Sequence, residues 1–256
     1  MNLSVKRISR GIAYRAKKIL NINVDKIDFS KIRHSTSISD GFIWRTDGSY
    51  KTIFRFSDIF RLFYNIKNSD IDLSFYDKNY NLIKELKLEN IELSNEIIID
   101  KKFLNNKEDY GIFHIFHKKQ NLKLDNMTIL SNRCYLGFSS NSKLPSFVHG
   151  NTYTMSKNID GEGTYSDFIK KTFFCTNRYR IQNSFKDFEK TELFFVNPSS
   201  KKIIFYLNDE KYELNGFCSK IISINNSNEA YIRSNCSFLR PIVFNYNNDF
   251  MDVYHS

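Results

Sequence analysis

The sequence predicts a mainly β protein, with one or two antiparallel β-sandwich units of immunoglobulin-like or jelly-roll-like type after an N-terminal amphipathic α-helix. Short apolar runs rich in Ile and Phe recur along the chain, and this composition is typical of strands. Clusters of Asn, Asp, Gly and Ser separate these runs, as turns separate strands. The chain has 256 residues, of which 41% are hydrophobic, so it can bury a substantial core.

The first 20 residues form a basic element. They contain six Lys or Arg residues and no acid, so they carry +6 of the chain's formal charge of +10. At the α-helical period, the apolar side chains of residues 3–20 gather mainly in an arc of about 140°. A cationic face beside an aliphatic face is typical of a helix in the headgroup layer of an anionic membrane. The predicted membrane-binding residues are Lys6, Arg7, Arg10, Arg15, Lys17 and Lys18.

Three other interpretations of this element stay open. The helix could dock on the protein's own core, act as an organellar transit peptide, or bind nucleic acid phosphates. No second basic patch supports the last of these, so we expect no nucleic acid partner. No stretch reaches the roughly 18 apolar residues that a membrane-spanning helix needs. We therefore expect a protein that is peripheral on the membrane.

The cysteines indicate a reducing compartment. No two of them have CxxC spacing, and all lie in or beside predicted strands, where a free thiol behaves as a small apolar group. With no export signal in the sequence, we expect free thiols and a cytoplasmic location. The four cysteines are Cys134, Cys175, Cys218 and Cys236.

Residues 21–40 are expected to be a connector, and strands follow from Gly41. Asp47-Gly48 between two alternating runs predicts a hairpin. The expected strands of the first half are 42–46, 50–56, 71–76, 82–88, 97–99 and 110–117. Those of the second half are 171–181, 191–196, 203–207, 211–214, 217–224, 230–233, 238–246 and 250–255. This spacing indicates a sandwich or barrel.

The predicted organisation has four parts. They are a basic helix and connector (1–40), a first β-sandwich unit (41–130), a connecting loop segment (131–170) and a second β-sandwich unit (171–256). The halves also resemble one another locally: residues 62–65 resemble 193–197, and a Phe-Tyr pair recurs 130 residues later, at 75–76 and 205–206. An internal repeat is the hypothesis, and chance likeness between strand-and-turn patterns is the alternative.

The segment most typical of a ligand site is 131–182. It gathers Gly, Ser, Pro, His and Tyr residues across the predicted junction of the units, and such junctions often hold pockets. Strand alternation places Arg178, Arg180 and Gln182 on one face. Guanidinium, amide, imidazole and aromatic groups suit a sugar or a phosphate-bearing ligand, with an ordinary interdomain linker as the alternative. The predicted ligand-binding residues are Arg133, His149, Tyr153, Arg178, Arg180 and Gln182.

Catalytic and metal motifs are not evident in the sequence. His114 and His117 form an HxxH pattern, but residues three apart in a strand point to opposite faces, so we expect no metal site and no cofactor. Cys134 with His149 would be a nucleophile–base pair without an orienting acid. The carboxylates of Asp58, Asp72 and Asp77 are expected to be solvated charges at strand edges.

The sequence thus favours a non-catalytic binding or accessory protein at the cytoplasmic membrane surface. Its expected ligand is a glycan, a lipid-linked intermediate of envelope or polysaccharide assembly, or a partner protein. One alternative is an enzyme acting on a sugar or phosphorylated substrate, with its site in residues 131–182. A second alternative is a structural module that associates through exposed strand edges.

Overall fold

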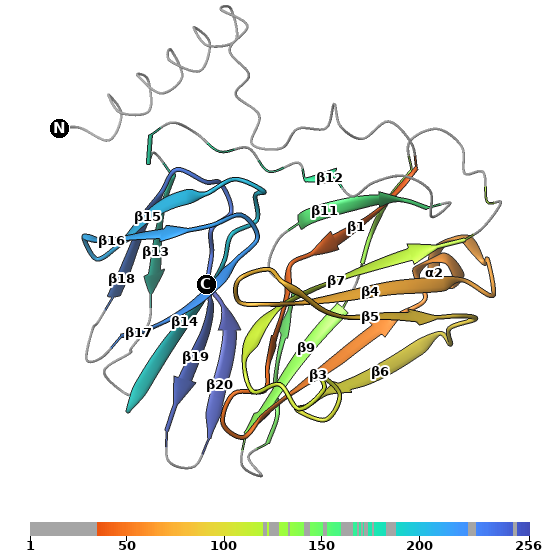
Figure 1. Ribbon diagram of the computed structural model, residues 1–256, viewed down its shortest axis with the longest axis horizontal. Helices are drawn as coiled ribbons and strands as arrows, with labels where there is room; N and C mark the ends of the chain where they lie inside the picture. The colour runs from red at the N-terminus through yellow and green to blue at the C-terminus, as the bar shows by residue number, and fades with distance from the viewer. Residues whose placement is uncertain are drawn as a thin grey trace, which may run out of the picture.

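The computed structural model confirms that the protein is mainly β and sandwich-like (Figure 1). The described residues form five four-stranded sheets, in which all strand pairs are antiparallel except β1–β8. The predicted helix over residues 3–20 lies outside the described residues. The structure describes residues 35–119, 122, 128–132, 134–140, 144–150, 153–159, 166–167, 169, 171, 174–175, 177–182, 188–224, 229–247 and 250–256.

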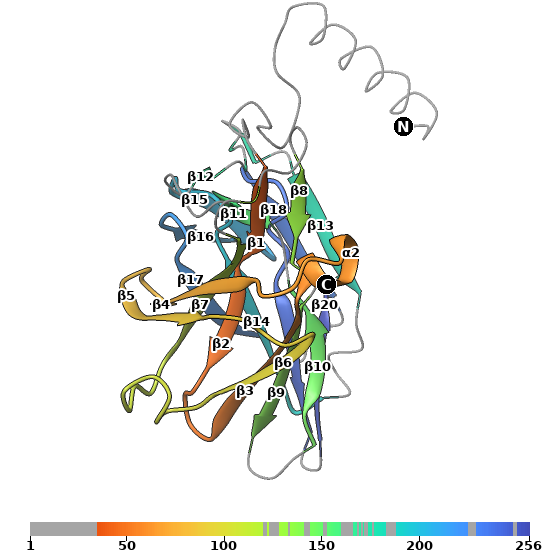
Figure 2. The same cartoon turned by 90° about the vertical axis from the view of Figure 1, so that its right-hand side faces the viewer.

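The first unit packs two sheets face to face and carries a third sheet at one end (Figure 2). One sheet has the order β2 (Phe42–Arg45), β7 (Tyr110–Lys118), β4 (Asp70–Asp77), β5 (Leu82–Leu88). The facing sheet has the order β10 (Ser146–His149), β9 (Cys134–Ser140), β3 (Tyr50–Ser57), β6 (Ser94–Ile99). The third sheet has the order β12 (Ser166–Asp167), β11 (Tyr153–Asn158), β1 (Thr36–Asp40), β8 (Ile129–Ser131).

Aromatic rings fill the first core. Phe42, Phe54 and Phe113 are all at most 1% exposed, and the rings of Phe54 and Phe113 meet edge to face at 4.7 Å between centroids. Edge-to-face pairs of this kind contribute about 0.5–1.5 kcal/mol beyond the burial of apolar area. Many of the Ile and Phe side chains of the first unit therefore pack in the core between the two sheets.

The second unit is also a pair of facing sheets. Its outer sheet has the order β13 (Asn177–Gln182), β18 (Glu229–Ser234), β15 (Ile203–Leu207), β16 (Glu210–Leu214). Its inner sheet has the order β17 (Ser219–Ile224), β14 (Lys190–Val196), β19 (Ile242–Tyr246), β20 (Met251–His255). A second hydrophobic core lies between them.

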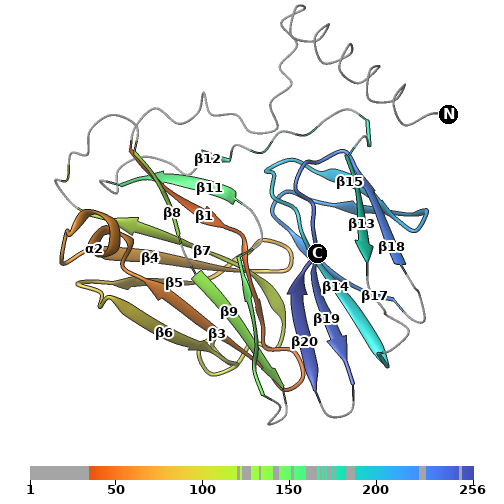
Figure 3. The same cartoon turned by 180° about the vertical axis from the view of Figure 1, so that it is seen from behind.

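The inner sheet of the second unit is buried on both faces. Along β14, Leu193 and Phe195 belong to the second core, whereas Phe194 and Val196 belong to the first. A strand covered on both sides has a continuous apolar run instead of an alternating one, as β14 does. Figure 3 shows β14, β19 and β20 lying between the rest of the two units. We call this sheet the shared wall.

A polar contact extends the shared wall at its edge. The backbone N–H of Val253 in β20 donates to the Ser146 side-chain oxygen in β10 at 3.0 Å. Edge strand β10 of the first unit therefore meets edge strand β20 of the second. The Ser146 side chain thus takes the place of a backbone partner for Val253 at this junction.

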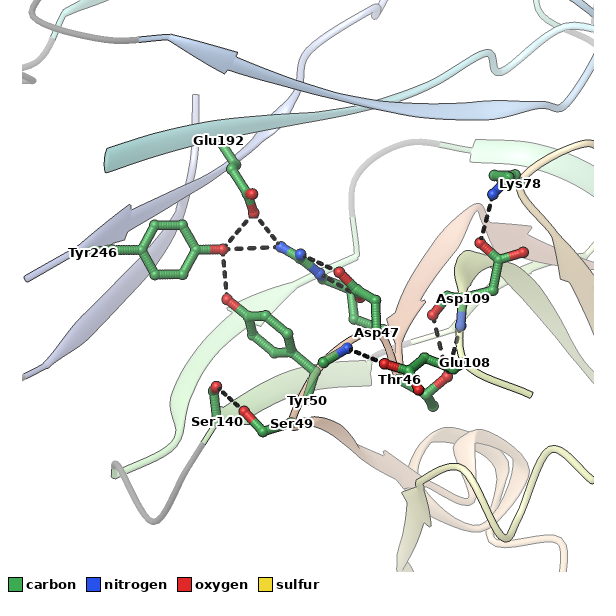
Figure 4. Close-up of polar contacts among 12 residues, drawn as sticks. Thr46, Asp47, Ser49, Tyr50, Lys78, Glu108, Asp109, Ser140, Glu192 and Tyr246 are labelled. Atoms are coloured by element: carbon green, nitrogen blue, oxygen red, sulfur yellow. Dashed lines mark hydrogen bonds and ion pairs between the residues drawn. The ribbon is translucent and has the colours of Figure 1, made fainter. Parts of the chain in front are cut away.

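A buried ion pair also joins the units. Arg45 is only 3% exposed, and its Nη1 donates to Glu192 Oε2 in the shared wall at 2.6 Å. Its Nε and Nη2 donate to the two carboxylate oxygens of Asp47 at 3.0 and 2.6 Å. The hydroxyl of Tyr246 donates to Glu192 at 2.5 Å and accepts from the hydroxyl of Tyr50 at 2.5 Å (Figure 4). We call these five residues the inter-unit clamp.

Glu192 and Tyr50 of the clamp each keep one protonation state near neutral pH. Burial alone would raise the pKa of the Glu192 carboxyl, but Arg45, Lys190 and Tyr246 together lower it to about 2. Burial raises the pKa of Tyr50 to about 12, so its hydroxyl keeps the proton that it donates. Glu192 is therefore an anion and Tyr50 a neutral donor throughout the neutral pH range.

Residues 131–170, predicted as a connecting loop, instead contain strands of the first unit. β9 pairs with β3 from Tyr50 opposite Ser140 to Phe56 opposite Cys134, and β11 pairs with β1. Glycine and serine give this segment a loop-like composition, but its described strands satisfy their backbone hydrogen bonds in ladders. Strands β9, β10 and β11 of this segment therefore belong to the first unit, whereas Ile169 near its end packs in the second core.

The two local matches on which the internal repeat was predicted differ in their outcome. Residues 59–64 form helix α2 (Ile59–Tyr64), whereas their proposed counterparts at 193–197 lie mostly in strand β14. The Phe-Tyr pairs do lie in matching hairpins, β4–β5 and β15–β16. β4 also pairs with β7, as β15 does with β18, so the orders β2-β7-β4-β5 and β13-β18-β15-β16 correspond strand for strand. The orders β6-β3-β9-β10 and β17-β14-β19-β20 correspond in the same way, so the likeness extends to both sheet pairs, while the internal repeat itself stays a prediction.

The three acids expected to be solvated are buried. Asp58 is 0% exposed and caps α2 by accepting from the backbone N–H groups of Phe60 and Arg61. Asp72 is 7% exposed and bonds Lys118 at 2.7 Å and Lys157 at 2.9 Å. Asp77, 8% exposed, accepts from backbone N–H groups in the β4–β5 turn. Each carboxylate accepts from donors of the protein in place of water, although Asp58 does so through Oδ1 alone.

Candidate functional site

The predicted ligand-binding residues divide between two surfaces. His149 lies on the exposed side of β10 in the first unit, whereas Arg178 and Arg180 lie on the exposed side of β13 in the second. Arg133 lies outside the described residues. Tyr153 and Gln182 lie in β11 and β13, but their side chains are outside what the structure describes. The structure therefore does not join His149 and Arg178 in one site.

The first surface is the outer side of the sheet β10-β9-β3-β6. Strand register aligns Glu96, Arg55, Tyr135 and His149 across the four strands. The rings of Tyr135 and His149 lie 4.5 Å apart between centroids, and Arg55 Nε donates to Glu96 Oε2 at 2.7 Å. We call these four residues, together with Phe147, the aromatic face.

Gly137 makes room for the ring of Phe147 on this sheet. A Cβ atom at Gly137 would stand 2.6 Å from the Phe147 ring, so any larger residue would displace that ring. The guanidinium of Arg55 lies 4.8 Å from the centroid of the same ring. Tyr135 and Phe147 are 49% and 37% exposed, so both rings also face solvent. A groove of about 370 Å³ runs along Arg55, Phe56, Ser57, Ser94, Tyr135 and Phe147.

The second surface is the outer side of the sheet β13-β18-β15-β16. Register places Arg178 opposite Arg233, and Arg233 opposite Tyr206. Two residues further along the same strands, on the same face, Arg180 lies opposite Tyr231. We call these five residues the arginine–tyrosine face. They line a groove of about 550 Å³ together with Tyr179, Asn208, Asp209 and Ile232.

The two histidines of the HxxH pattern point to opposite faces of β7, as expected. His114 Nδ1 lies 3.3 Å from both the Asp40 carbonyl oxygen and Thr154 Oγ1. His117 instead lies 2.5 Å from Asn132 Oδ1 and 3.1 Å from the Ser57 carbonyl oxygen. Burial lowers the pKa of each imidazole to about 4, so both are neutral at neutral pH.

Cys134 and His149 cannot form the proposed nucleophile–base pair. Cys134 is 3% exposed and faces the core, whereas His149 is exposed on the outer side of the same sheet. Burial also raises the pKa of the Cys134 thiol, so its thiolate is disfavoured. All four cysteines are free. Among the described residues, no group of three His, Cys, Asp or Glu side chains could hold a metal ion.

Sequence reasoning missed several residues of both surfaces. Tyr135 alternates with the buried Cys134 and Leu136, so its outward direction was readable once β9 was recognised as a strand. The same holds for Tyr231 and Arg233 in β18. Their cross-strand neighbours were not readable, because strand register is set by pairing between distant segments.

Comparisons with known proteins identify no relative. No protein-family model matches the sequence, and no curated protein matches it. In the part of the chain that the structure describes, no helix is long and apolar enough to cross a membrane. The function is therefore argued from the two surfaces themselves.

The buried His114 predicts a pH-dependent stability. Its pKa is about 4 in the folded state and 6.5 as an ordinary imidazole, so between these values only the unfolded chain takes up the proton. Folding stability is therefore lost as the pH falls from 6.5 to 4, by about 3 kcal/mol for this residue. His114→Phe removes this contribution while keeping an aromatic ring beside Tyr76 and Phe217.

Urea unfolding of the parent and of His114→Phe at pH 7, 5.5 and 4 tests this prediction. Because His117 titrates in both proteins, the difference between their unfolding free energies isolates His114. This difference should shift in favour of the variant by about 3 kcal/mol between pH 7 and pH 4. Parallel profiles would show that His114 does not stay neutral in the folded state.

Proposed function

We propose that the chain is a non-catalytic, glycan-binding protein and that the aromatic face contacts the sugar. The observation that carries the proposal is the pair of exposed rings, Tyr135 and Phe147, lying on a sheet beside a groove. A sugar ring presents C–H groups on one side, and these pack against an aromatic ring. Its hydroxyl groups point outward and need donors and acceptors around that ring.

The rim of the groove supplies such groups. Arg55 and Glu96 form an exposed ion pair at one side, and Ser57 and Ser94 lie opposite one another in register. A guanidinium and a carboxylate can each bind two neighbouring hydroxyls, since both are planar and two-pronged. An apolar platform with a few polar groups around it is the usual composition of a small-ligand site.

The chemistry of the aromatic face favours binding over catalysis. The neighbour of the His149 imidazole across the strands is the ring of Tyr135, and the carboxylate of Glu96 is paired with Arg55 instead. The two histidines whose pKa is strongly lowered, His114 and His117, are buried in the first unit. General acid–base catalysis needs a proton donor or acceptor within reach of the substrate, and the buried His114 and His117 do not meet that requirement.

We also propose that residues 1–20 hold the protein at an anionic membrane surface. Their +6 charge and segregated apolar positions support this part of the proposal. The glycan would then be lipid-linked or part of an envelope polysaccharide, and the protein an accessory to its assembly at the cytoplasmic side. Each basic residue at such a surface contributes about 1 kcal/mol of binding free energy.

Glycan binding is tested with Tyr135→Ala and Phe147→Ala. Removal of a ring that a sugar covers should weaken affinity about ten- to hundredfold, because a buried aromatic contributes about 1.5–3 kcal/mol. An oligosaccharide array finds the ligand, and isothermal titration calorimetry measures the affinities. Phe250→Ala is the control, since Phe250 is equally exposed at 49% but lies in the second unit, beside β20. Equal losses in all three variants, or no glycan bound by the parent, would contradict the proposal.

Membrane attachment is tested by co-sedimentation with vesicles. The full chain should bind vesicles of phosphatidylglycerol and phosphatidylcholine, should not bind phosphatidylcholine alone, and should be released by added salt. A chain lacking residues 1–20 should remain in solution. Retained binding by the shortened chain would place the membrane contact elsewhere.

A further inference from the structure

We propose that the arginine–tyrosine face is a second, separate ligand site that takes a phosphate or sulfate oxyanion. This face lies on the outer sheet of the second unit, whereas the aromatic face belongs to the first (Figure 1). The inference rests on charge and register and is independent of the proposed glycan function.

Two arginines oppose one another across neighbouring strands. Arg178 of β13 and Arg233 of β18 are direct partners in the antiparallel register, and both are exposed. Side chains at such positions start about 4.5–5.5 Å apart at Cβ, and like charges placed there repel. An anion between the two guanidinium groups would turn this repulsion into attraction.

Acidic partners neutralise only part of this face. Arg180 is paired with Glu229 through both its Nε and Nη2. In the described part of the chain, neither Arg178 nor Arg233 forms an ion pair, and Asp209 is the one carboxylate lining the groove. The groove therefore keeps an excess of positive charge next to the Arg178–Arg233 pair.

The tyrosines orient the site and leave room beside it. The guanidinium of Arg233 lies 4.4 Å from the centroid of the Tyr206 ring, which fixes the plane of its N–H groups. Tyr231 is 54% exposed, so its ring is open to the group that carries the oxyanion. At about 550 Å³ the groove can hold an oxyanion together with a sugar-sized substituent.

The chemistry favours phosphate or sulfate over a neutral ligand. Guanidinium groups bind such oxyanions through two parallel N–H···O bonds, and tetrahedral oxyanions offer enough oxygens for two arginines at once. The exposed arginine of the aromatic face provides the contrast, since Arg55 lies opposite Glu96 and its charge is already balanced.

Isothermal titration calorimetry with inorganic phosphate and sulfate tests the site. The parent should bind, whereas Arg178→Ala and Arg233→Ala should each weaken binding at least tenfold through the loss of a charge-assisted fork. Arg178→Lys keeps the positive charge but loses the two parallel N–H donors, so its affinity should lie between those of the parent and Arg178→Ala. Arg61→Ala is the control, because it also removes one exposed guanidinium but lies on α2 beside Glu92.

Thermal unfolding of the same variants separates binding from folding. Removal of Arg178 relieves a repulsion, so without ligand the melting temperature of Arg178→Ala should stay equal to that of the parent or rise, whereas Arg233→Ala also loses the contact with the Tyr206 ring. Added phosphate should raise the melting temperature of the parent and not that of Arg178→Ala. Equal affinity in parent, Arg178→Ala and Arg233→Ala would overturn the proposal, as would an equal loss in Arg61→Ala.

Two further probes identify the source of the oxyanion. Glucose 1-phosphate and phosphatidic acid vesicles both present a phosphate monoester, the first on a sugar and the second on a lipid. If either probe binds more tightly than inorganic phosphate, and Arg233→Ala abolishes that binding, the result supports the site and shows whether the oxyanion is carried on a sugar or on a lipid. If a single-stranded oligonucleotide binds far more tightly than every phosphate monoester, the assignment is overturned and the face is a nucleic acid surface.

Discussion

The buried ion pair between Arg45 and Glu192 is the contact on which the arrangement of the two units depends. Moving two such charges out of water costs several kcal/mol each, and only close partners and further hydrogen bonds offset that cost. Asp47 and Tyr246 supply those bonds, and the Tyr50 ring lies 4.0 Å from the guanidinium carbon. The pair therefore tolerates one relative placement of the units and penalises others.

The shared wall explains why this placement matters. One face of β14 and β19 completes the second core and the other completes the first, so neither unit buries its apolar residues without the other. Sliding of the wall would expose Phe194 or Phe244 and would separate Arg45 from Glu192 at once. Packing and charge thus select the same arrangement, and the two outer faces are carried on one body.

Most strands could be predicted from the sequence, but few of the contacts within the two surfaces could. The alternation of Ile203–Leu207 marked that strand correctly at both ends, since its pattern is local. Helix α2 was missed, although Asp58 before an apolar run is an N-cap signal. Arg45 and Glu192 are 147 positions apart, and Arg178 and Arg233 meet only through register. Neither pairing has a local pattern that could reveal it.

Native-state hydrogen exchange of Arg45→Ala is the most direct test of this account. Removal of one partner of a buried ion pair costs about 3–5 kcal/mol, and here it leaves Glu192 with only Lys190 and Tyr246 as partners among the described residues. Because the units share a wall, amides of β3 and β9 should lose the same protection as amides of β14 and β19. Arg55→Ala, with its exposed ion pair to Glu96, should lose less than about 1 kcal/mol anywhere. Loss of protection confined to one unit would contradict the account.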